Sequence, residues 1–197
     1  MDTPGVECRP IRDITGEKMF NEVFFTDARI PATDRLGEEG AGWQVAMGTL
    51  GRERVGTAGQ AITMAADLRA MISAARAVNP DSLADSDIRE RIARLYTEIE
   101  LTKLLNYRAL TKIIKGQKNW PEVPLAKLQW SYLAQALAEL ALDLLGPHGL
   151  LAKGSPDAVD GGSWNRSYNF QRYTTIGAGA TEVQKNIIAD RALLPRK

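Results

Sequence analysis

The chain has 197 residues, of which 44% are apolar and 25% are charged, and its net charge is +1. A chain of this length can bury a hydrophobic core of its own, and its balanced charge gives no footprint for nucleic acid or an anionic membrane. Cys8 and His148 are the only cysteine and the only histidine, which excludes an internal disulfide and a metal site with several thiolate or histidine ligands.

Three features favour a cytoplasmic protein. A single cysteine is typical of a reducing compartment. The longest apolar run, Leu133–Leu145, is interrupted by Gln135, Glu139 and Asp143 and is shorter than the roughly 20 residues that a membrane helix needs. The first residues lack the basic start and the apolar stretch of a signal peptide.

The first 37 residues predict extended structure. Val23-Phe24-Phe25 is an apolar run typical of a strand, and Pro31 ends it. Two or three short strands do not form a stable sheet by themselves. We therefore expect residues 1–37 to be a piece of a larger structure.

Long helices are predicted next. The first extends from Gly42 to about Val78, a stretch without proline that Asn79-Pro80 ends. The second covers about Ser86–Ile114, and the third about Pro124–Leu145. The third is apolar most of the way round, so we expect it to lie at the centre of the fold. The candidate N-caps of the second helix are Ser82, Asp85 and Ser86.

The remaining chain predicts a loop at 146–163, a short helix at 165–173 and a last helix from about Ala180 to Leu193. Thr181, or the glycines before it, is the expected cap of this last helix. The predicted fold class is mainly α: an up-and-down four-helix bundle with a short N-terminal β-strand remnant.

Two short stretches are candidates for chemistry. Gly177–Ala180 precedes a helix, where free N–H groups can hold a phosphate, but such glycines also serve tight turns. Arg52-Glu53-Arg54 offers a carboxylate that can act as a general base if it faces a cavity, or form a solvated ion pair if it does not. No nucleotide-binding P-loop, zinc spacing or nucleophile elbow is present in the sequence.

Four stretches of the sequence carry a recognisable pattern: Phe20–Pro31, Leu36–Trp43, Thr181–Arg191 and Leu193–Arg196. Taken in this order, they resemble the acyl-CoA dehydrogenase family. The resemblance covers nearly the whole chain but only about the second half of a family member. It implies that residues 1–37 are a remnant of the middle β-domain and its linker, and that residues 38–197 form the C-terminal helical bundle.

This resemblance implies an FAD-dependent α,β-dehydrogenation of an acyl-CoA substrate. In the family a glutamate removes the α-proton of the thioester while the β-hydrogen leaves as hydride to the flavin. The family also implies electron-transfer flavoprotein as the electron acceptor. It further implies a homo-oligomer, or a partner subunit that supplies the missing domains.

The catalytic base is predicted at Glu53. Many family members carry the base before the terminal helix in a Glu-Gly-Thr pattern, but the corresponding residues here are Ala178-Gly179-Ala180. A second group carries it on the first bundle helix, directly before an arginine. Glu53 followed by Arg54 matches that pattern, so the resemblance implies Glu53 as base and Arg54 as a substrate-binding residue. We expect the Glu53 carboxyl to face the interior groove of the bundle.

The predicted cofactor-binding residues fall in two segments: Gly146 and Gly149, and Gly179, Thr181 and Glu182. Both segments depart from the family pattern. The family's Gln-x-x-Gly-Gly, which reaches the FAD of a neighbouring subunit, is replaced by Asp143–Pro147, and an aspartate there is expected to repel a pyrophosphate.

The second departure is Ala180, which removes a hydroxyl that Thr181 is placed to replace. These changes leave three interpretations open: an acyl-CoA dehydrogenase part, a non-catalytic assembly subunit that does not hold FAD by itself, and a related acyl-CoA oxidase.

Overall fold

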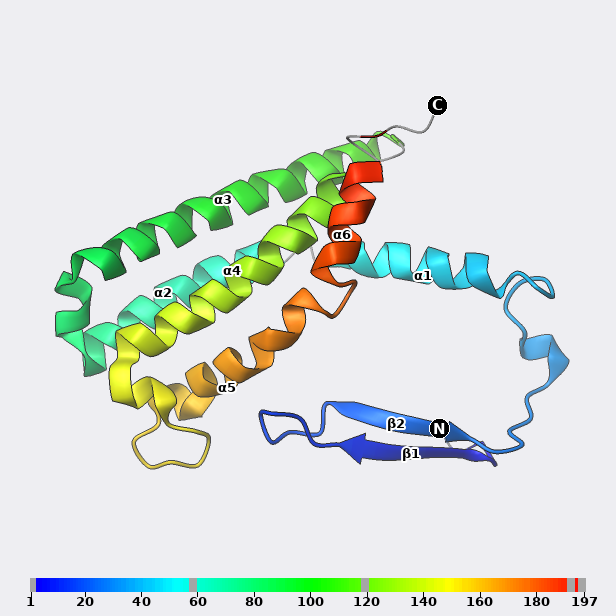
Figure 1. Ribbon diagram of the computed structural model, residues 1–197, viewed down its shortest axis with the longest axis horizontal. Coiled ribbons are helices and arrows are strands. Elements are labelled where there is room, and N and C mark those ends of the chain that lie inside the picture. Colours follow the sequence, from blue (N-terminus) through cyan, green and yellow to red (C-terminus); the bar gives the residue numbers. More distant parts are fainter. Residues whose placement is uncertain (1–2, 57–59, 118–120, 191–193, 195–197) are drawn as a thin grey trace. The chain divides into compact units, whose positions relative to one another are not determined.

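The computed structural model describes residues 3–56, 60–117, 121–190 and 194, and leaves aside the side chains of residues 51–56 and 61 (Figure 1). The chain divides into two compact units, Met1–Gly51 and Arg52–Lys197. Each unit is described by itself.

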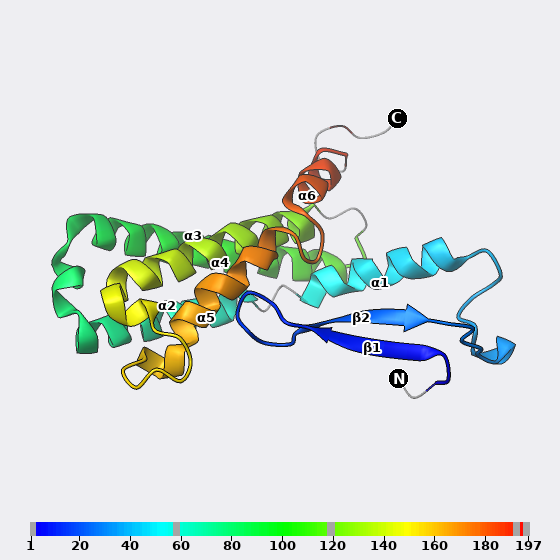
Figure 2. The same cartoon turned by 60° about the horizontal axis from the view of Figure 1, so that its bottom comes forward.

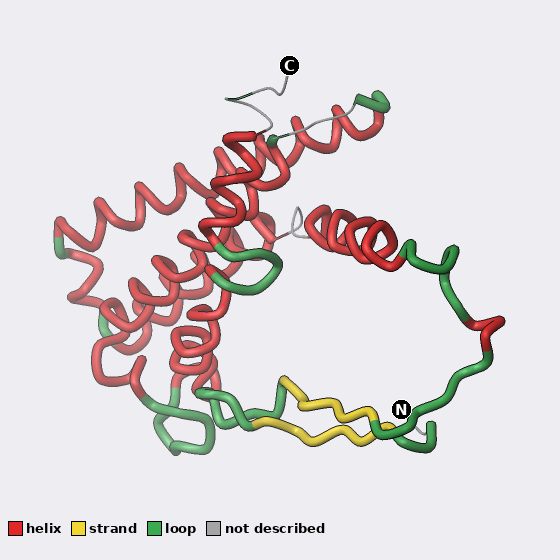
Figure 3. Tube along the Cα trace, turned by 45° about the vertical axis from the view of Figure 1, so that its right-hand side comes forward, coloured by secondary structure: helices red, strands yellow, loops and turns green. Residues whose placement is uncertain are grey.

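The first unit contains a β-hairpin. Strands β1 (Val6–Ile11) and β2 (Phe20–Phe25) pair antiparallel, with Val6 opposite Phe25 and Ile11 opposite Phe20 (Figure 3). The predicted strand at Val23–Phe25 is therefore confirmed as part of β2. A two-stranded hairpin is marginal in water by itself.

A short 3-10 turn, η1 (Ala32–Asp34), follows the hairpin, and helix α1 (Gly42–Gly56) comes next. The predicted first helix, 42–78, appears as α1 and α2 (Gln60–Val78). Residues 57–59 between them lie outside the described residues.

The second unit is built on three long helices that run in alternating directions (Figures 1 and 2). These are α2, α3 (Ser86–Ile114) and α4 (Glu122–Leu145). Helices α5 and α6 both pack against α4. The remaining elements of this unit are η3 (Pro80–Ala84), η4 (Gly146–Leu150), η5 (Val159–Gly162), α5 (Ser163–Phe170), η6 (Gln171–Thr175) and α6 (Thr181–Ile188).

Helix α4 is the centre of the second unit. It contacts α2, α3, α5 and α6, and its buried residues cover most of its circumference, apart from one stripe on which Tyr132, Glu139 and Asp143 are exposed. Leu133, Leu140 and Leu144 are almost fully buried and join Met71 and Ile99 in one core. This confirms the interpretation of a helix that is apolar most of the way round. The predicted fold class, mainly α with a small N-terminal β-element, is also confirmed.

The N-terminus of α3 carries a predicted cap, whereas the N-terminus of α6 does not. The Asp85 carboxylate caps α3 by accepting hydrogen bonds from the N–H groups of Asp87 (2.8 Å) and Ile88 (3.3 Å). Thr181 is the first residue of α6 rather than its cap. Its hydroxyl donates to the Thr175 carbonyl (3.4 Å) instead, and Ala180 stands at the N-cap, so the predicted cap at Thr181 or at the glycines before it is wrong.

None of the described helices combines the length and the apolar character that crossing a bilayer requires.

Candidate functional site

The predicted base and its neighbour belong to α1. The backbone of Glu53 and Arg54 is helical, but their side chains lie outside the described residues. The expected orientation of the Glu53 carboxyl toward an interior groove therefore stays a prediction.

The turn before α6 has an unusual backbone. Ala178 and Gly179 are successive residues with left-handed φ angles, 53° and 99°. A Cβ atom on Gly179 would overlap Nε2 of Gln184, so this position requires glycine for both its conformation and its space. Gln184 is fully buried, and its Nε2 donates to the carbonyls of Ala178 (3.2 Å) and Gly179 (3.3 Å). The turn is thus fixed from the α6 side.

A buried lysine fixes the same turn from the α4 side. Lys127 is fully buried, and its Nζ donates to the carbonyls of Gly179 (2.7 Å) and Thr174 (2.9 Å). Burial lowers the pKa of the Lys127 ammonium. The Ser131 hydroxyl also donates to the Thr174 carbonyl (2.8 Å). Sequence reasoning missed this group, although a lysine in a helix that is apolar on most faces was a usable signal.

The first turn of α6 keeps backbone donors available. Ala180 stands at the N-cap, and no side chain of the described residues caps this end. The free N–H groups and the helix dipole of such an end favour acceptor oxygens and anions. Glu182 is exposed in this turn, where a carboxylate also interacts favourably with the dipole. Thr181 is buried, with its hydroxyl directed to its own chain.

The other predicted cofactor residues lie at the far end of α4. Gly146 ends the helix with a left-handed φ of 56°. Gly149 is buried, and a Cβ there would stand 3.1 Å from Cα of Leu142 and 3.2 Å from Cβ of Leu145. The close packing against α4 explains why residue 149 is a glycine. The C-terminal end of α4 is also joined to the end of α2, because Asn79 Nδ2 donates to the Leu144 carbonyl (2.9 Å).

The negative charge of the Asp143 carboxylate is paired with a neighbouring arginine. Asp143 accepts a hydrogen bond from Nη2 of Arg91 (2.8 Å), and Glu139 accepts one from Nη1 of Arg172 (2.9 Å). Arg91, Glu139 and Asp143 border a groove of about 610 Å³ that also includes Gly146. The expected repulsion of a pyrophosphate by Asp143 is therefore reduced, but Arg91 is already engaged.

The predicted cofactor residues thus form two separate groups. Gly179 is bonded to Lys127 near the start of α4, and Gly146 follows the end of α4. The axial rise of a helix places those two ends of α4 roughly 25–30 Å apart. A single chain therefore does not bring both groups into one site.

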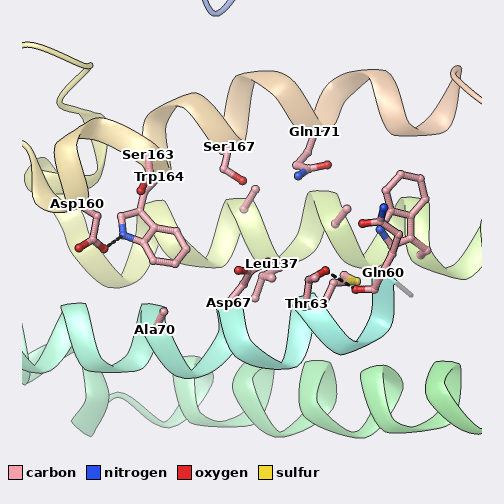
Figure 4. Close-up of a pocket in the computed structure, with 14 residues that line it drawn as sticks. Gln60, Thr63, Asp67, Ala70, Leu137, Asp160, Ser163, Trp164, Ser167 and Gln171 are labelled. Carbon is pink, nitrogen blue, oxygen red and sulfur yellow. Dashed lines mark hydrogen bonds between the residues drawn. The ribbon is translucent and has the colours of Figure 1, made fainter. Parts of the chain in front are cut away.

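A pocket that the sequence did not reveal lies between α2, α4 and α5 (Figure 4). Its volume is about 410 Å³. Trp130 and Trp164 form part of its wall, and Trp164 Nε1 donates to the Asp160 carboxylate (2.7 Å). Asp67 also faces the pocket, and burial raises its pKa.

The charge of this pocket limits its ligands. Two carboxylates and no lysine or arginine line it among the described residues. Such a lining disfavours the phosphates of a nucleotide. No group of three or more metal-ligating side chains occurs in the part of the chain that the structure describes.

The family profile described as "Acyl-CoA dehydrogenase, C-terminal domain" matches residues 40–193. The chain belongs to the acyl-CoA dehydrogenase family. The resemblance inferred from the motifs is therefore confirmed. Among curated acyl-CoA dehydrogenases, "Acyl-CoA dehydrogenase IpdE1" of Mycolicibacterium smegmatis is 40% identical over 200 residues, covering 100% of this chain and 48% of that protein.

Several solved structures share the fold. The "Tcur3481-Tcur3483 steroid ACAD" matches with a TM-score of 0.88 at 23% identity, over 100% of this chain and 50% of that one. The ChsE4-ChsE5 complex from Mycobacterium tuberculosis matches with a TM-score of 0.84 at 27% identity, over 100% of this chain and 52% of that one. The chain spans about half the length of the curated relatives it matches.

Proposed function

We propose that this chain is the carboxy-terminal part of an FAD-dependent acyl-CoA dehydrogenase and that Glu53 is its base. One observation carries the proposal. The position before α6 where many members place the base is Ala178, whereas Glu53 stands directly before Arg54 on the first helix. Glu53 then takes the α-proton of an acyl-CoA thioester, and Arg54 contributes to substrate binding. A base in this role needs a pKa near the working pH.

FAD supplies the hydride acceptor when it is bound. The first turn of α6 fits such a group, because its N–H groups are not capped by a side chain and can donate to acceptor oxygens. Gly179 lets the backbone approach closely there, and Thr181 and Glu182 follow it in the first turn. We assign these three residues to the cofactor site.

The second group of predicted cofactor residues, Gly146 and Gly149, serves a different cofactor molecule. Gly146 and Gly149 lie at the opposite end of α4 from Gly179. The separation of roughly 25–30 Å along the helix favours their contact with the FAD of a neighbouring subunit. The active assembly is then a homo-oligomer, or a complex with a partner subunit that supplies the missing domains. Electron-transfer flavoprotein is the expected electron acceptor.

A second function has its own support: a non-catalytic assembly subunit that does not hold FAD by itself. At the end of α4 the cations Arg91 and Arg172 are paired with Asp143 and Glu139. Little positive charge is left there for a pyrophosphate. The similarity at 27% identity to a chain of the ChsE4-ChsE5 complex is compatible with this alternative.

Flavin binding and activity separate the two proposals. Purified chain is dialysed against FAD, and bound flavin is measured from its visible absorption. Activity is then followed with acyl-CoA thioesters and an electron-accepting dye. The dehydrogenase proposal expects stoichiometric flavin and turnover that Glu53→Gln reduces at least about a hundredfold, in the upper part of what proton transfer contributes.

Glu90→Gln is the matched control. Glu90 is an exposed helical glutamate paired with Arg94, and its substitution is expected to leave turnover unchanged. Full activity in Glu53→Gln would refute the base assignment. Flavin and turnover that appear only when a second polypeptide is added, and that Glu53→Gln leaves unchanged in that complex, would favour the assembly subunit.

A further inference from the structure

The buried lysine on α4 needs a reason beyond stability. The Lys127 side chain has no contact with solvent, so its ammonium group loses all of its hydration on folding. Lysine is almost never fully buried unless it is paired. No carboxylate pairs with Lys127 among the residues whose side chains the structure describes. Its recorded acceptors are two backbone carbonyls, those of Thr174 and Gly179.

Neither carbonyl depends on the lysine alone. The Thr174 carbonyl also accepts from the Ser131 hydroxyl (2.8 Å), and the Gly179 carbonyl also accepts from Gln184 Nε2 (3.3 Å). Removal of the ammonium would therefore leave each acceptor with one donor. It would also remove the desolvation cost of a buried cation, and apolar replacement of buried charges is often neutral or stabilising.

The lysine instead fixes the position of two segments. It joins η6, which contains Thr174, to the turn at Gly179. That turn contains the left-handed pair Ala178 and Gly179. A left-handed alanine is a strained conformation that persists only when its surroundings hold it. The same turn determines where the N–H groups of α6 begin.

We propose that Lys127 is a positioning residue, whose ammonium holds the Gly177–Ala180 turn and the first N–H groups of α6 in the single conformation that receives the cofactor. This inference rests on the proposed function, because it takes the cofactor to be FAD at the start of α6. The Lys127 ammonium is bonded to the carbonyl of Gly179, two residues before α6 begins at Thr181, so the cation and the helix N-terminus both contribute positive potential at this turn.

The first test measures the turn without any cofactor. Hydrogen exchange of the wild-type chain is compared with Lys127→Met, which keeps an unbranched apolar stem of nearly the same length but removes the donor. Peptides spanning 174–184 are expected to exchange at least tenfold faster in Lys127→Met, while peptides from α3 stay unchanged. Ser131→Ala is the matched control, since it removes a hydrogen bond to Thr174 but leaves the bond to Gly179.

Three results would overturn the positioning role. The first is a hydrogen-exchange rate at 174–184 that is the same in Lys127→Met as in the wild type. The second is an increase in that rate in Ser131→Ala as large as the one in Lys127→Met. The third is failure of both Lys127→Met and Lys127→Gln to fold, because the lysine would then be required for the core and not for the turn.

The second test links the turn to the cofactor. Lys127→Met is expected to bind FAD at least tenfold more weakly than Ser131→Ala, and to shift the midpoint potential of the bound flavin to a more negative value. Loss of the cation that is bonded to the Gly179 turn is expected to destabilise the electron-rich reduced flavin, an effect that a purely structural role would not produce. Equal affinity and potential in the two variants would overturn the link. If even the wild-type chain binds no FAD, the proposed function fails for this chain, and the exchange result still decides the positioning role.

Discussion

Replacement of Gly179 by alanine should destabilise the chain for two reasons that the turn makes explicit. An L-residue with a left-handed backbone costs about 1–2 kcal/mol, and φ at Gly179 is 99°. The new Cβ would also displace the Gln184 amide, whose two hydrogen bonds to the turn contribute about 0.5–1.5 kcal/mol each. The reduced entropy of the unfolded alanine chain offsets about 0.4–1 kcal/mol. The net loss is about 1.5–4 kcal/mol.

Urea unfolding of the 197-residue chain measures this loss. With an m-value of about 2–3 kcal/mol/M, the midpoint is expected to fall by roughly 1 M. Ala178→Gly is the matched control at the preceding position, where φ is 53°. Glycine adopts that conformation freely, so this variant should be unchanged or more stable by up to about 1 kcal/mol. A Gly179→Ala midpoint within roughly 0.2 M of the wild type, or a destabilised Ala178→Gly, would show that the turn is not held as described.

Three further predictions concern polar and ionisable side chains. Trp164→Phe should lower the free energy of unfolding by about 0.5–1.5 kcal/mol, because the Asp160 carboxylate loses its indole donor; urea denaturation checks this, and a loss equally large in an Asp160→Asn background would contradict it. Burial raises the pKa of Asp67 above its ordinary value of 3.8, so its contribution to stability is complete below that value and is lost as pH rises through the higher folded pKa. Asp67→Asn should therefore become more stable than the wild type as pH increases, and midpoints that stay parallel over the acidic range would refute this. Burial alone would raise the pKa of Glu122, but Lys112 and Arg108 lower it overall, so its contribution is present above the ordinary value of 4.5 and is lost as pH falls. Glu122→Gln should be less stable than the wild type at neutral pH, with a difference that shrinks on acidification; a constant difference in unfolding midpoint would argue against these ion pairs.

Local signals were sufficient for most of the helices. The second predicted helix has the bounds of α3, Ser86–Ile114, because Asp85 is a strong cap and the stretch up to Gly116 contains good helix formers. The short helix at 165–173 was placed two residues late, since α5 starts at Ser163. Its start follows a glycine-rich 3-10 turn in which Asp160 and Gly161 have left-handed backbones, and sequence patterns locate such boundaries poorly.

The family, the mainly α fold and the central place of α4 could be predicted from the residues alone, because they depend on motif order and on the period of apolar residues along one helix. Which polar groups meet could not be predicted in this way and depends on how the chain folds. Lys127 reaches a carbonyl 52 residues away at Gly179, and Arg91 pairs with Asp143 at the same separation in sequence. The same is true of the pocket where Asp67 lies near two tryptophans of other helices. Periodicity tells which face of a helix is apolar, but the partners of a buried charge are set by how the helices pack against one another.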